Sequence, residues 1–297
     1  MQAFGPDAEE TQVTRSFLFV PGDSERKLEK ALDVGADAFI VDLEDSVAAA
    51  ARPAARQMTA EFLAGKDNVW VRINPLDSAD AIADLEAVLS AAPAGIVLPK
   101  ARNGDDIVNL SETIDAAERE FGLARDAIKI MPLVTERPES MFALGSYAGR
   151  STRMTAMSWG AEDLSAAVGA SRNRDDDGNW LPTYEMARSL CLLAAAAAEV
   201  AALDTVYTDF RNTEGLARYA ANARRDGFSG MLAIHPAQVE VINDAFRPSP
   251  QEIRQAERIV ELFDANPGAG AVGLDGKMID RPHHLQALRI LQLAKRQ

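Results

Sequence analysis

The sequence predicts an α/β protein, a (β/α)8 TIM barrel with a C-terminal helical extension. Three observations indicate this fold. The chain has 297 residues, it contains eight short apolar runs, and the segments between those runs have helical spacing and charged faces. Strands of a parallel sheet are buried on both faces, so they form continuous apolar runs. Eight strand-and-helix units in roughly 230 residues match a (β/α)8 barrel. A doubly wound open sheet is the alternative, but it usually has fewer strands and a glycine-rich first turn.

The predicted strands are rich in β-branched and other apolar residues. In chain order they are Ser16–Val20, Ala38–Val41, Val69–Ile73, Gly95–Leu98, Ile128–Leu133, Met154–Trp159, Thr205–Tyr207 and Met231–Ile234. Helical spacing is clearest at Glu25–Val34, Ala79–Ser90, Asp105–Glu120 and Thr213–Arg225. The alternation breaks once, at Ala161–Leu181, before an alanine-rich helix that is predicted to run through Ala202. This long polar segment is predicted to be a lid or a binding loop.

The two ends of the chain lie outside the predicted barrel, which spans residues 14–247. Residues 1–13 are polar and acidic without any period, which predicts a flexible arm. Residues 248–297 form the predicted extension, with a helix after Pro250 and another from about Arg281. Between these helices, Gly268–Gly273 matches G-x-G-x-x-G, but no strand is expected before it and no helix after it. We therefore predict a flexible linker there rather than a dinucleotide site.

Composition excludes several classes of protein. Hydrophobic residues make up 47% of the chain and charged residues 26%, which is typical of a globular protein and not of a disordered or fibrous one. The formal net charge of −14 disfavours nucleic acid and anionic membranes as partners. The single cysteine, Cys191, cannot form an intramolecular disulfide or a thiolate metal cluster. Without a signal peptide or membrane-spanning run, the sequence predicts a cytoplasmic protein.

Charged side chains gather at the predicted carboxyl ends of the strands, where barrel proteins carry their chemistry. The polar residues at these positions are Asp42, Glu44, Asp45, Arg72, Asn74, Lys100, Glu136, Arg137, Glu162, Asp163, Asp209 and His235. Loops between strands and helices are often polar and supply helix caps, which explains part of this set. The remainder predicts a functional site at one rim.

Glu136 and Asp163 follow consecutive predicted strands, so their carboxylates can approach one another. Two carboxylates alone repel each other, and a divalent cation removes that conflict. The chain has three histidines and one cysteine, without H-x-x-x-H or C-x-x-C spacing, which disfavours zinc. Mg²⁺ bound to one or two carboxylates is the better prediction. Structural salt bridges are the alternative.

Arg72 ends a Val-Trp-Val run, so its side chain is expected to point into the mouth of the barrel. A guanidinium there is suited to bidentate capture of a carboxylate or to contact with an enolate oxygen. The alternative is that Arg72 is a buried partner of the nearby acids.

Nine motifs occur in order across nearly the whole chain, and together they resemble the citrate lyase β-subunit and malyl-CoA lyase family, within the HpcH/HpaI aldolase group. They are RSFLFVPGDS (15–24), VDLEDSV (41–47), VRINP (71–75), LPKA (98–101), TER (135–137), GAEDL (160–164), DTVYTD (204–209), IHPAQV (234–239) and GKMID (276–280). The sequence departs from the family at Met231, where a lysine is usual.

The resemblance implies roles for the matching residues. Glu136 and Asp163 are implied to bind Mg²⁺, and Arg72 to grip the acid substrate and the enolate oxygen. Glu44 and Asp45 are implied to act in catalysis by holding waters on the metal. The residues implied to bind substrate are Arg72, Glu136, Ala161 and Glu162. Asp280 resembles an acid/base group delivered from a neighbouring subunit, which implies a homotrimer or a higher homo-oligomer.

The activity implied by the resemblance is Mg²⁺-dependent cleavage or formation of a carbon–carbon bond in a 3-hydroxyacyl thioester, such as malyl-, citramalyl- or citryl-CoA. The implied partners are an acyl-CoA or acyl-carrier thioester and a small keto acid: oxaloacetate, glyoxylate or pyruvate. The alternatives are an acyl-CoA thioesterase on the same scaffold, an aldolase acting on free 2-keto acids, and a barrel that binds without catalysis.

Overall fold

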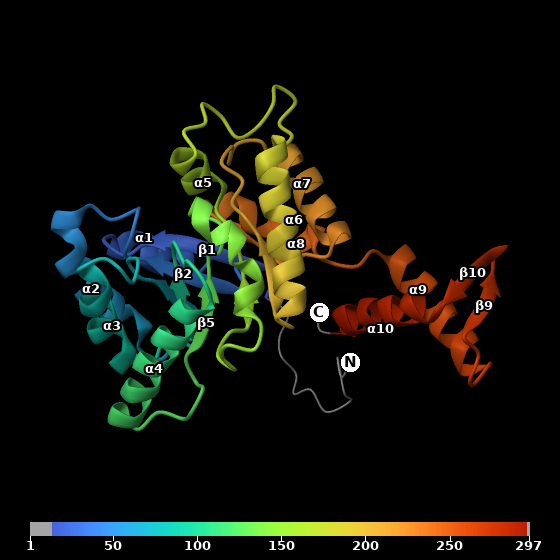
Figure 1. The fold of residues 1–297 in the computed structure, drawn as a ribbon, viewed down its shortest axis with the longest axis horizontal. Coiled ribbons are helices and arrows are strands. Elements are labelled where there is room, and N and C mark those ends of the chain that lie inside the picture. The colour runs from blue at the N-terminus through green and yellow to red at the C-terminus, as the bar shows by residue number, and fades with distance from the viewer. Residues whose placement is uncertain (1–13, 296–297) are drawn as a thin grey trace. The chain divides into compact units, whose positions relative to one another are not determined.

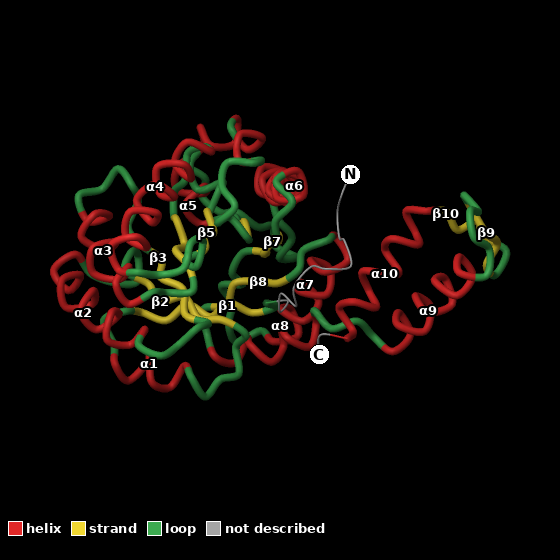
Figure 2. Tube along the Cα trace, turned by 90° about the horizontal axis from the view of Figure 1, so that it is seen from below, coloured by secondary structure: helices red, strands yellow, loops and turns green. Residues whose placement is uncertain are grey.

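The computed structural model describes residues 14–295, and it confirms the (β/α)8 barrel (Figures 1 and 2). The strands are β1 (Ser16–Pro21), β2 (Ala38–Asp42), β3 (Val69–Arg72), β4 (Gly95–Leu98), β5 (Lys129–Pro132), β6 (Ala156–Met157), β7 (Ala201–Asp204) and β8 (Gly230–Ala233). All neighbouring strands are parallel, in the order β5-β4-β3-β2-β1-β8-β7-β6. Bridges from Ile130 to Met154 and from Leu133 to Ser158 join the two ends of this sheet and close the barrel.

The prediction for the seventh strand was wrong, because that strand precedes Thr205–Tyr207 in the chain. It begins at Ala201, where the preceding alanine-rich helix was expected to continue. Ala201 and Ala202 pair with β6, and Leu203 and Asp204 pair with β8. Alanine favours helices by itself, so only the two neighbouring strands place this segment in the sheet. As a result, Asp204 and not Asp209 stands at the carboxyl end of β7.

Helices surround the strands (Figure 2). They are α1 (Glu25–Ala31), α2 (Arg52–Leu63), α3 (Asp80–Val88), α4 (Gly104–Phe121), α5 (Ala161–Ala167), α6 (Pro182–Ala197), α7 (Thr213–Asp226) and α8 (Val239–Ala245). Inside the barrel, apolar side chains from the strands form the core, among them Ile40, Trp70, Met131 and Leu232. Gly95 is required there, because a Cβ atom would lie 2.4 Å from the Trp70 ring.

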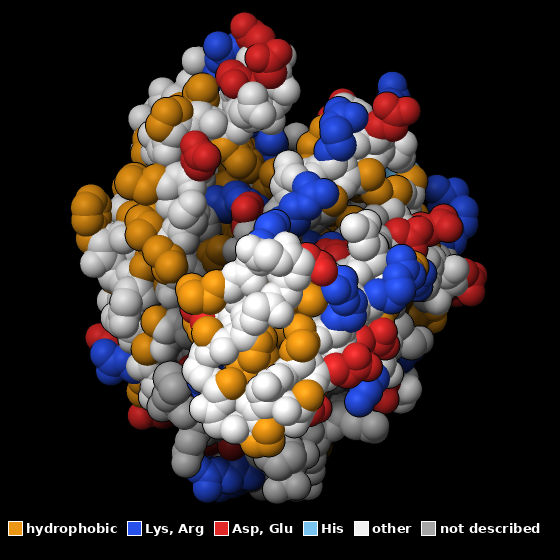
Figure 3. All heavy atoms as spheres, turned by 90° about the vertical axis from the view of Figure 1, so that its right-hand side faces the viewer, with side chains coloured by type: hydrophobic (Ala, Val, Ile, Leu, Met, Phe, Trp, Pro, Cys, Tyr) orange, Lys and Arg blue, Asp and Glu red, His pale blue; other side chains and the backbone are white. Residues whose placement is uncertain are grey.

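The segment predicted as a lid begins with helix α5 and continues as an irregular loop over residues 168–181. Trp180 anchors this loop: its ring lies edge-on to Trp159, with 5.0 Å between ring centroids, and its indole N–H donates to Tyr219. The Arg174 guanidinium lies over the Trp180 ring, 3.4 Å from the ring centroid. Charged side chains of both signs gather at the tip of the loop, at the top of Figure 3.

The chain divides into two compact units, Thr14–Ala245 and a C-terminal unit that begins at Phe246. The C-terminal unit contains α9 (Pro250–Asp264), β9 (Ala271–Leu274), β10 (Lys277–Asp280) and α10 (Arg281–Lys295). Strands β9 and β10 form an antiparallel hairpin around Asp275 and Gly276, which both have positive φ, as a tight hairpin turn requires. The predicted flexible linker is therefore wrong in part, since Ala271–Leu274 is a strand.

Among the described residues, no helix combines the length and the apolar character that crossing a lipid bilayer requires. The predicted arm at residues 1–13 lies outside the described residues.

Candidate active site

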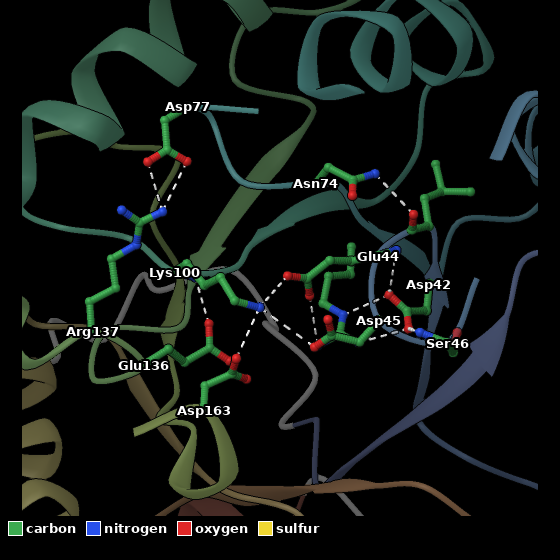
Figure 4. A network of polar contacts seen from close by, with 12 residues as sticks. Asp42, Glu44, Asp45, Ser46, Asn74, Asp77, Lys100, Glu136, Arg137 and Asp163 are labelled. Carbon is green, nitrogen blue, oxygen red and sulfur yellow. Dashed lines mark hydrogen bonds and ion pairs between the residues drawn. The ribbon is translucent and has the colours of Figure 1, made fainter. Parts of the chain in front are cut away.

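Several residues singled out in the sequence lie together at the carboxyl ends of β2 to β6 (Figure 4). Asp42 ends β2 and is directly followed by the turn that carries Glu44 and Asp45, while Arg72 ends β3. Lys100 follows β4, Glu136 follows β5 and Asp163 lies in the first turn of α5. Parallel strands bring these groups to one rim, although up to 121 residues separate them in the chain.

Arg72 is held by a carboxylate of its own protein. Its Nε and Nη2 donate to Asp42 at 2.6 and 2.7 Å, a bidentate pair across the register of β2 and β3. Burial alone would lower the pKa of Arg72, but the hydrogen bonds and the charge of Asp42 outweigh it and raise the pKa. The remaining nitrogen, Nη1, lies 3.1 Å from Glu44 Oε2. The structure thus shows that Arg72 is a buried partner of the nearby acids, with one edge of the guanidinium on Asp42 and the other facing Glu44.

Glu44 is buried between two cations. Lys100 Nζ contacts its Oε1 at 2.5 Å, and Arg72 lies beside Oε2 without hydrogen-bond geometry. Oε2 is therefore a buried oxygen that has no hydrogen-bond partner among the described residues. Burial raises the pKa of Glu44, and the charges of Arg72 and Lys100 offset this only in part. Such an oxygen is well placed to accept a hydrogen bond from a ligand or a water molecule.

Glu136 is a buried member of the cluster, with 4% of its surface exposed. Its Oε2 accepts a hydrogen bond from the backbone N–H of Lys100 at 2.5 Å. Burial, followed by the negative charges of Asp163 and Glu44, raises the pKa of Glu136 to about 8. Gly160 makes room for this carboxylate, because a Cβ atom there would lie 2.5 Å from Glu136 Cγ. The site therefore contains a carboxylate whose negative charge is not fully balanced by positive groups of the protein.

Lys100 connects the whole cluster, although the sequence indicated only its place after a strand and no role. Its Nζ lies 2.5 Å from Glu44 Oε1, 3.0 Å from Asp163 Oδ1 and 3.6 Å from Asp45 Oδ2 (Figure 4). Its φ angle of 52° is left-handed, which is uncommon for a residue with a side chain. This conformation accompanies the contacts of its backbone N–H with Glu136 and of its ammonium group with Glu44 and Asp163. The signal in the sequence was the LPKA motif at a strand end.

The other candidate residues are placed differently. Asp45 belongs to the cluster but is exposed, and Ala161 lines, with Asp45, a cavity at the mouth of the barrel. Glu162 also lines the cavity, and its carboxylate accepts a hydrogen bond from Asn173 at 2.9 Å. Asp280 lies in the C-terminal unit at the end of β10, where its carboxylate contacts His283. The hydrogen bond with His283 lowers the pKa of Asp280.

A divalent cation fits this donor set. Glu136 and Asp163 are adjacent hard-oxygen donors, and the charge of Asp163 adds to the effect of burial in raising the pKa of Glu136. No group of three or more His, Cys, Asp and Glu side chains suited to a metal ion occurs within residues 14–295. Mg²⁺ needs no such group, because it commonly takes one or two carboxylates and keeps water or substrate oxygens as its other ligands.

Fold and site together define a class: a (β/α)8-barrel protein with an acidic mouth suited to a hard divalent cation. Residues 15–236 match the family described as HpcH/HpaI aldolase/citrate lyase. The chain belongs to this family, as the sequence motifs predicted.

Three relatives illustrate the family. The chain is 33% identical to citrate lyase subunit beta of Haemophilus influenzae, covering 96% of this chain and 98% of that one. It is 35% identical to a (3S)-malyl-CoA thioesterase of Cereibacter sphaeroides, covering 95% and 94%. A crystal structure of CitE from Mycobacterium tuberculosis with magnesium, acetoacetate and coenzyme A superposes with a TM-score of 0.81 at 32% identity, covering 95% and 98%. The family description and the Haemophilus influenzae relative are named as lyases, and the Cereibacter sphaeroides relative is named as a thioesterase.

Proposed function

We propose that this protein is a Mg²⁺-dependent carbon–carbon lyase that cleaves or forms a 3-hydroxyacyl thioester, such as malyl-, citramalyl- or citryl-CoA, by a retro-Claisen route. The observation that carries the proposal is the buried Glu136 carboxylate beside Asp163, with its pKa raised to about 8. The magnesium and coenzyme A in the related CitE structure support the choice of cofactor and of thioester.

Glu136 and Asp163 would hold the cation. When bound there, Mg²⁺ supplies Lewis-acid polarisation of substrate oxygens and positive charge where the enolate develops. Glu44 and Asp45 extend the acidic surface on the other side of Lys100 and would hold water molecules beside the cation (Figure 4). The edge of Arg72 that faces Glu44 would bind the acid part of the substrate, because its other edge is occupied by Asp42. Glu136, Ala161 and Glu162 would complete the substrate-binding wall.

The bond changes balance without a redox partner. In cleavage, the 3-hydroxyl loses its proton to a carboxylate of the cluster, the C2–C3 bond breaks, and its electron pair passes into the thioester enolate. A keto acid leaves, and an acid returns a proton to C2. We assign this last transfer to Asp280. Its lowered pKa favours the ionised carboxylate, which is the form that removes a proton from C2 in the direction of condensation. In the direction of cleavage, Asp280 would first take up a proton from water and then give that proton to C2.

The role assigned to Asp280 implies that the protein forms an oligomer. We propose that the C-terminal unit of one subunit serves the barrel of another in a homotrimer or a higher homo-oligomer, with an acyl-CoA or acyl-carrier thioester and a small keto acid as the ligands. A cytoplasmic location is part of the same proposal.

A thioesterase is the second candidate, because one relative carries that name. A hydrolase releases free thiol and the intact hydroxy acid, whereas a lyase releases an acetyl thioester and a keto acid. Incubation with malyl-CoA and citramalyl-CoA, with thiol and keto acid measured in parallel, separates the two activities.

The test of the metal site uses Glu136→Gln and Asp163→Asn. Each change removes one ligand charge and preserves the shape of the side chain, so we expect both variants to fold, to lose Mn²⁺ binding in calorimetry and to lose Mg²⁺-dependent cleavage. Glu139→Gln is the matched control, since Glu139 follows the same strand but is exposed. Full activity with Mg²⁺ in either site variant would exclude the assignment.

A further inference from the structure

Lys100 places one cation in the middle of four carboxylates. Its Nζ lies 2.5 Å from Glu44 Oε1 and 3.6 Å from Asp45 Oδ2 on one side, and 3.0 Å from Asp163 Oδ1 on the other (Figure 4). Its backbone N–H donates to Glu136 Oε2. This one residue therefore contacts both proposed ligands of the cation, Glu136 and Asp163, and also the two acids beyond them.

The acids around Lys100 differ in how far basic groups already engage them. Both oxygens of Glu44 face a basic group, because Oε1 contacts Lys100 and Oε2 lies 3.1 Å from Arg72 Nη1. Asp45 Oδ2 lies 3.6 Å from Lys100 and 3.9 Å from Arg72. Within residues 14–295, these two basic side chains are the ones that form ion pairs with Glu44 and Asp45. Glu136, in contrast, forms no ion pair with a described residue, so its charge is the one left for an added cation.

We propose that Lys100 determines which cation the site accepts: its ammonium group keeps Glu44 and Asp45 from binding the cation directly, and it thereby favours Mg²⁺ over Ca²⁺. This inference rests on the proposed function, in which Glu136 and Asp163 hold the cation. It also gives the reason why Glu44 and Asp45 would hold water molecules beside the cation rather than the cation itself.

The two cations differ in the number of protein oxygens that they use. Mg²⁺ is commonly bound by one or two carboxylates and keeps several water molecules, whereas Ca²⁺ takes about six to eight oxygens in a flexible arrangement. The four carboxylates around Lys100 would approach that number if no basic group lay among them. The ammonium group withdraws oxygens from this set, and its charge opposes a second cation close by. What remains suits an ion that needs few protein ligands.

The side chain of Lys100 can be tested apart from its backbone. The hydrogen bond to Glu136 comes from the backbone N–H, which every substitution except proline keeps. Methionine, like lysine, is unbranched at Cβ, so Lys100→Met adds no new strain at the left-handed φ of 52°. This variant therefore removes the ammonium group and leaves the contact between the backbone and Glu136.

Calorimetry of Mg²⁺ and Ca²⁺ binding to the full chain measures the selectivity. For Lys100→Met, we expect the ratio of Ca²⁺ affinity to Mg²⁺ affinity to rise by roughly tenfold or more, because the freed oxygens of Glu44 and Asp45 add ligands that Ca²⁺ uses and Mg²⁺ does not need. Lys30→Met is the matched control, since it removes the same charge from an exposed position on α1. The control is expected to keep the ratio of the unaltered protein.

Restoring the ammonium group tests the cause. In Lys100→Cys, alkylation of the thiolate with 2-bromoethylamine displaces bromide and yields a lysine analogue with sulfur in its side chain. The Lys100 side chain is 22% exposed, so the reagent can reach this position. Cys191, the single cysteine of the unaltered chain, is fully buried and is expected to remain unmodified. The affinity ratio should be high before alkylation and should return to that of the unaltered protein after it. Unaltered protein treated with the reagent is the control.

A second variant covers a loss of folding. Lys100→Met leaves the buried Glu44 with Arg72 as its remaining ion-pair partner among the described residues, and a buried charge that loses a partner destabilises the fold. Lys100→Met combined with Glu44→Gln removes both charges of the pair, and it still frees Asp45 and Asp163 from the ammonium group. The ratio is expected to rise in this double variant too, by a smaller factor. Circular dichroism reports on the folding of each variant.

The outcomes separate this inference from the proposed function. If the unaltered protein binds Mg²⁺ but the affinity ratio does not rise when the ammonium group is removed, or does not fall again on alkylation, the inference is overturned and the lyase proposal stands. If the unaltered protein binds no Mg²⁺, the proposed function fails, and this inference fails with it.

Discussion

Arg72 shows how one side chain can be both a structural and a functional group. Two of its nitrogens bind Asp42, and the third faces Glu44 at the mouth of the barrel. The side chain is 12% exposed, so its charge is largely removed from water and depends on these partners. A guanidinium fixed in this way presents its remaining edge in one orientation, which favours a directed contact with a ligand.

The first prediction at the residue scale concerns the planar guanidinium group of Arg72. Arg72→Lys keeps the charge but loses the planar geometry, so kcat/KM for acyl-CoA cleavage is expected to fall by about 10²-fold or more. Thermal unfolding of the same variant reports on the lost Asp42 contact. Near-normal kcat/KM would show that Arg72 acts only as the partner of Asp42.

The second prediction concerns Asp42 and pH. Burial would raise the pKa of Asp42, but the hydrogen bonds and charge of Arg72 outweigh it and hold the pKa below its ordinary value of 3.8. Asp42→Asn leaves the Arg72 charge without its partner, which is expected to cost roughly 3–5 kcal/mol of the free energy of unfolding at pH 7. Because the folded-state pKa is lowered, this contribution is present above the ordinary pKa and is lost as pH falls through the lowered value.

Urea unfolding of both proteins over a range of pH measures this contribution. The difference between them should be constant near neutrality and should shrink below about pH 4. A difference that is negligible at pH 7 would contradict the role of the pair.

At the scale of elements, the junctions between strands and helices set the geometry of the site. The register of β2 and β3 places Asp42 opposite Arg72, and the β6–α5 junction places Gly160 against Glu136. Gly160 has φ of −118°, which any residue can adopt, so its role is to leave space rather than to permit a turn. Helix α5 then begins at Ala161 and presents Asp163 from its first turn.

The prediction at this scale is that Gly160→Ala displaces the Glu136 carboxylate, because the added Cβ atom would lie 2.5 Å from Cγ and 2.7 Å from Oε1. Mn²⁺ affinity is expected to fall by roughly 10- to 100-fold with little change in the melting temperature. Gly145→Ala is the matched control, since a Cβ atom there meets nothing within 4 Å. Unchanged Mn²⁺ affinity in Gly160→Ala would show that the carboxylate is free to move.

At the scale of the whole molecule, Asp280 belongs to a different compact unit from the barrel. The antiparallel pairing of β9 and β10 ends at this residue, and α10 follows directly. Its carboxylate contacts His283 in the first turn of α10. Asp280 directly precedes this helix, so it also stands at the position of a helix cap. Capping alone and catalysis in a neighbouring subunit therefore make different predictions for the same residue.

The prediction at this scale uses complementation. Asp280→Asn and Glu136→Gln proteins are each expected to be inactive, whereas mixed oligomers formed by subunit exchange are expected to regain activity. Some sites in the mixture combine an intact barrel with an intact C-terminal unit from another chain. If Asp280 only caps α10, Asp280→Asn alone would keep its turnover and its stability, because asparagine caps a helix as well as aspartate does. An inactive mixture would indicate that each C-terminal unit serves its own barrel.

The sequence by itself determined the barrel and the rim that carries the charged residues. Apolar runs and amphipathic segments are local patterns, and parallel strands necessarily share one carboxyl-terminal rim, so Glu136 and Asp163 could be brought together without coordinates. Only the tertiary structure decided where β7 begins, since Ala201 and Ala202 are placed in the sheet by β6 and not by their own preference. It also decided that Arg72 pairs with Asp42, 30 residues away, and that Lys100 joins Glu44 to Asp163. Several acids at this rim could pair with each basic side chain. Distance and burial in the folded chain decide which pairs form, and the order of residues does not specify either quantity.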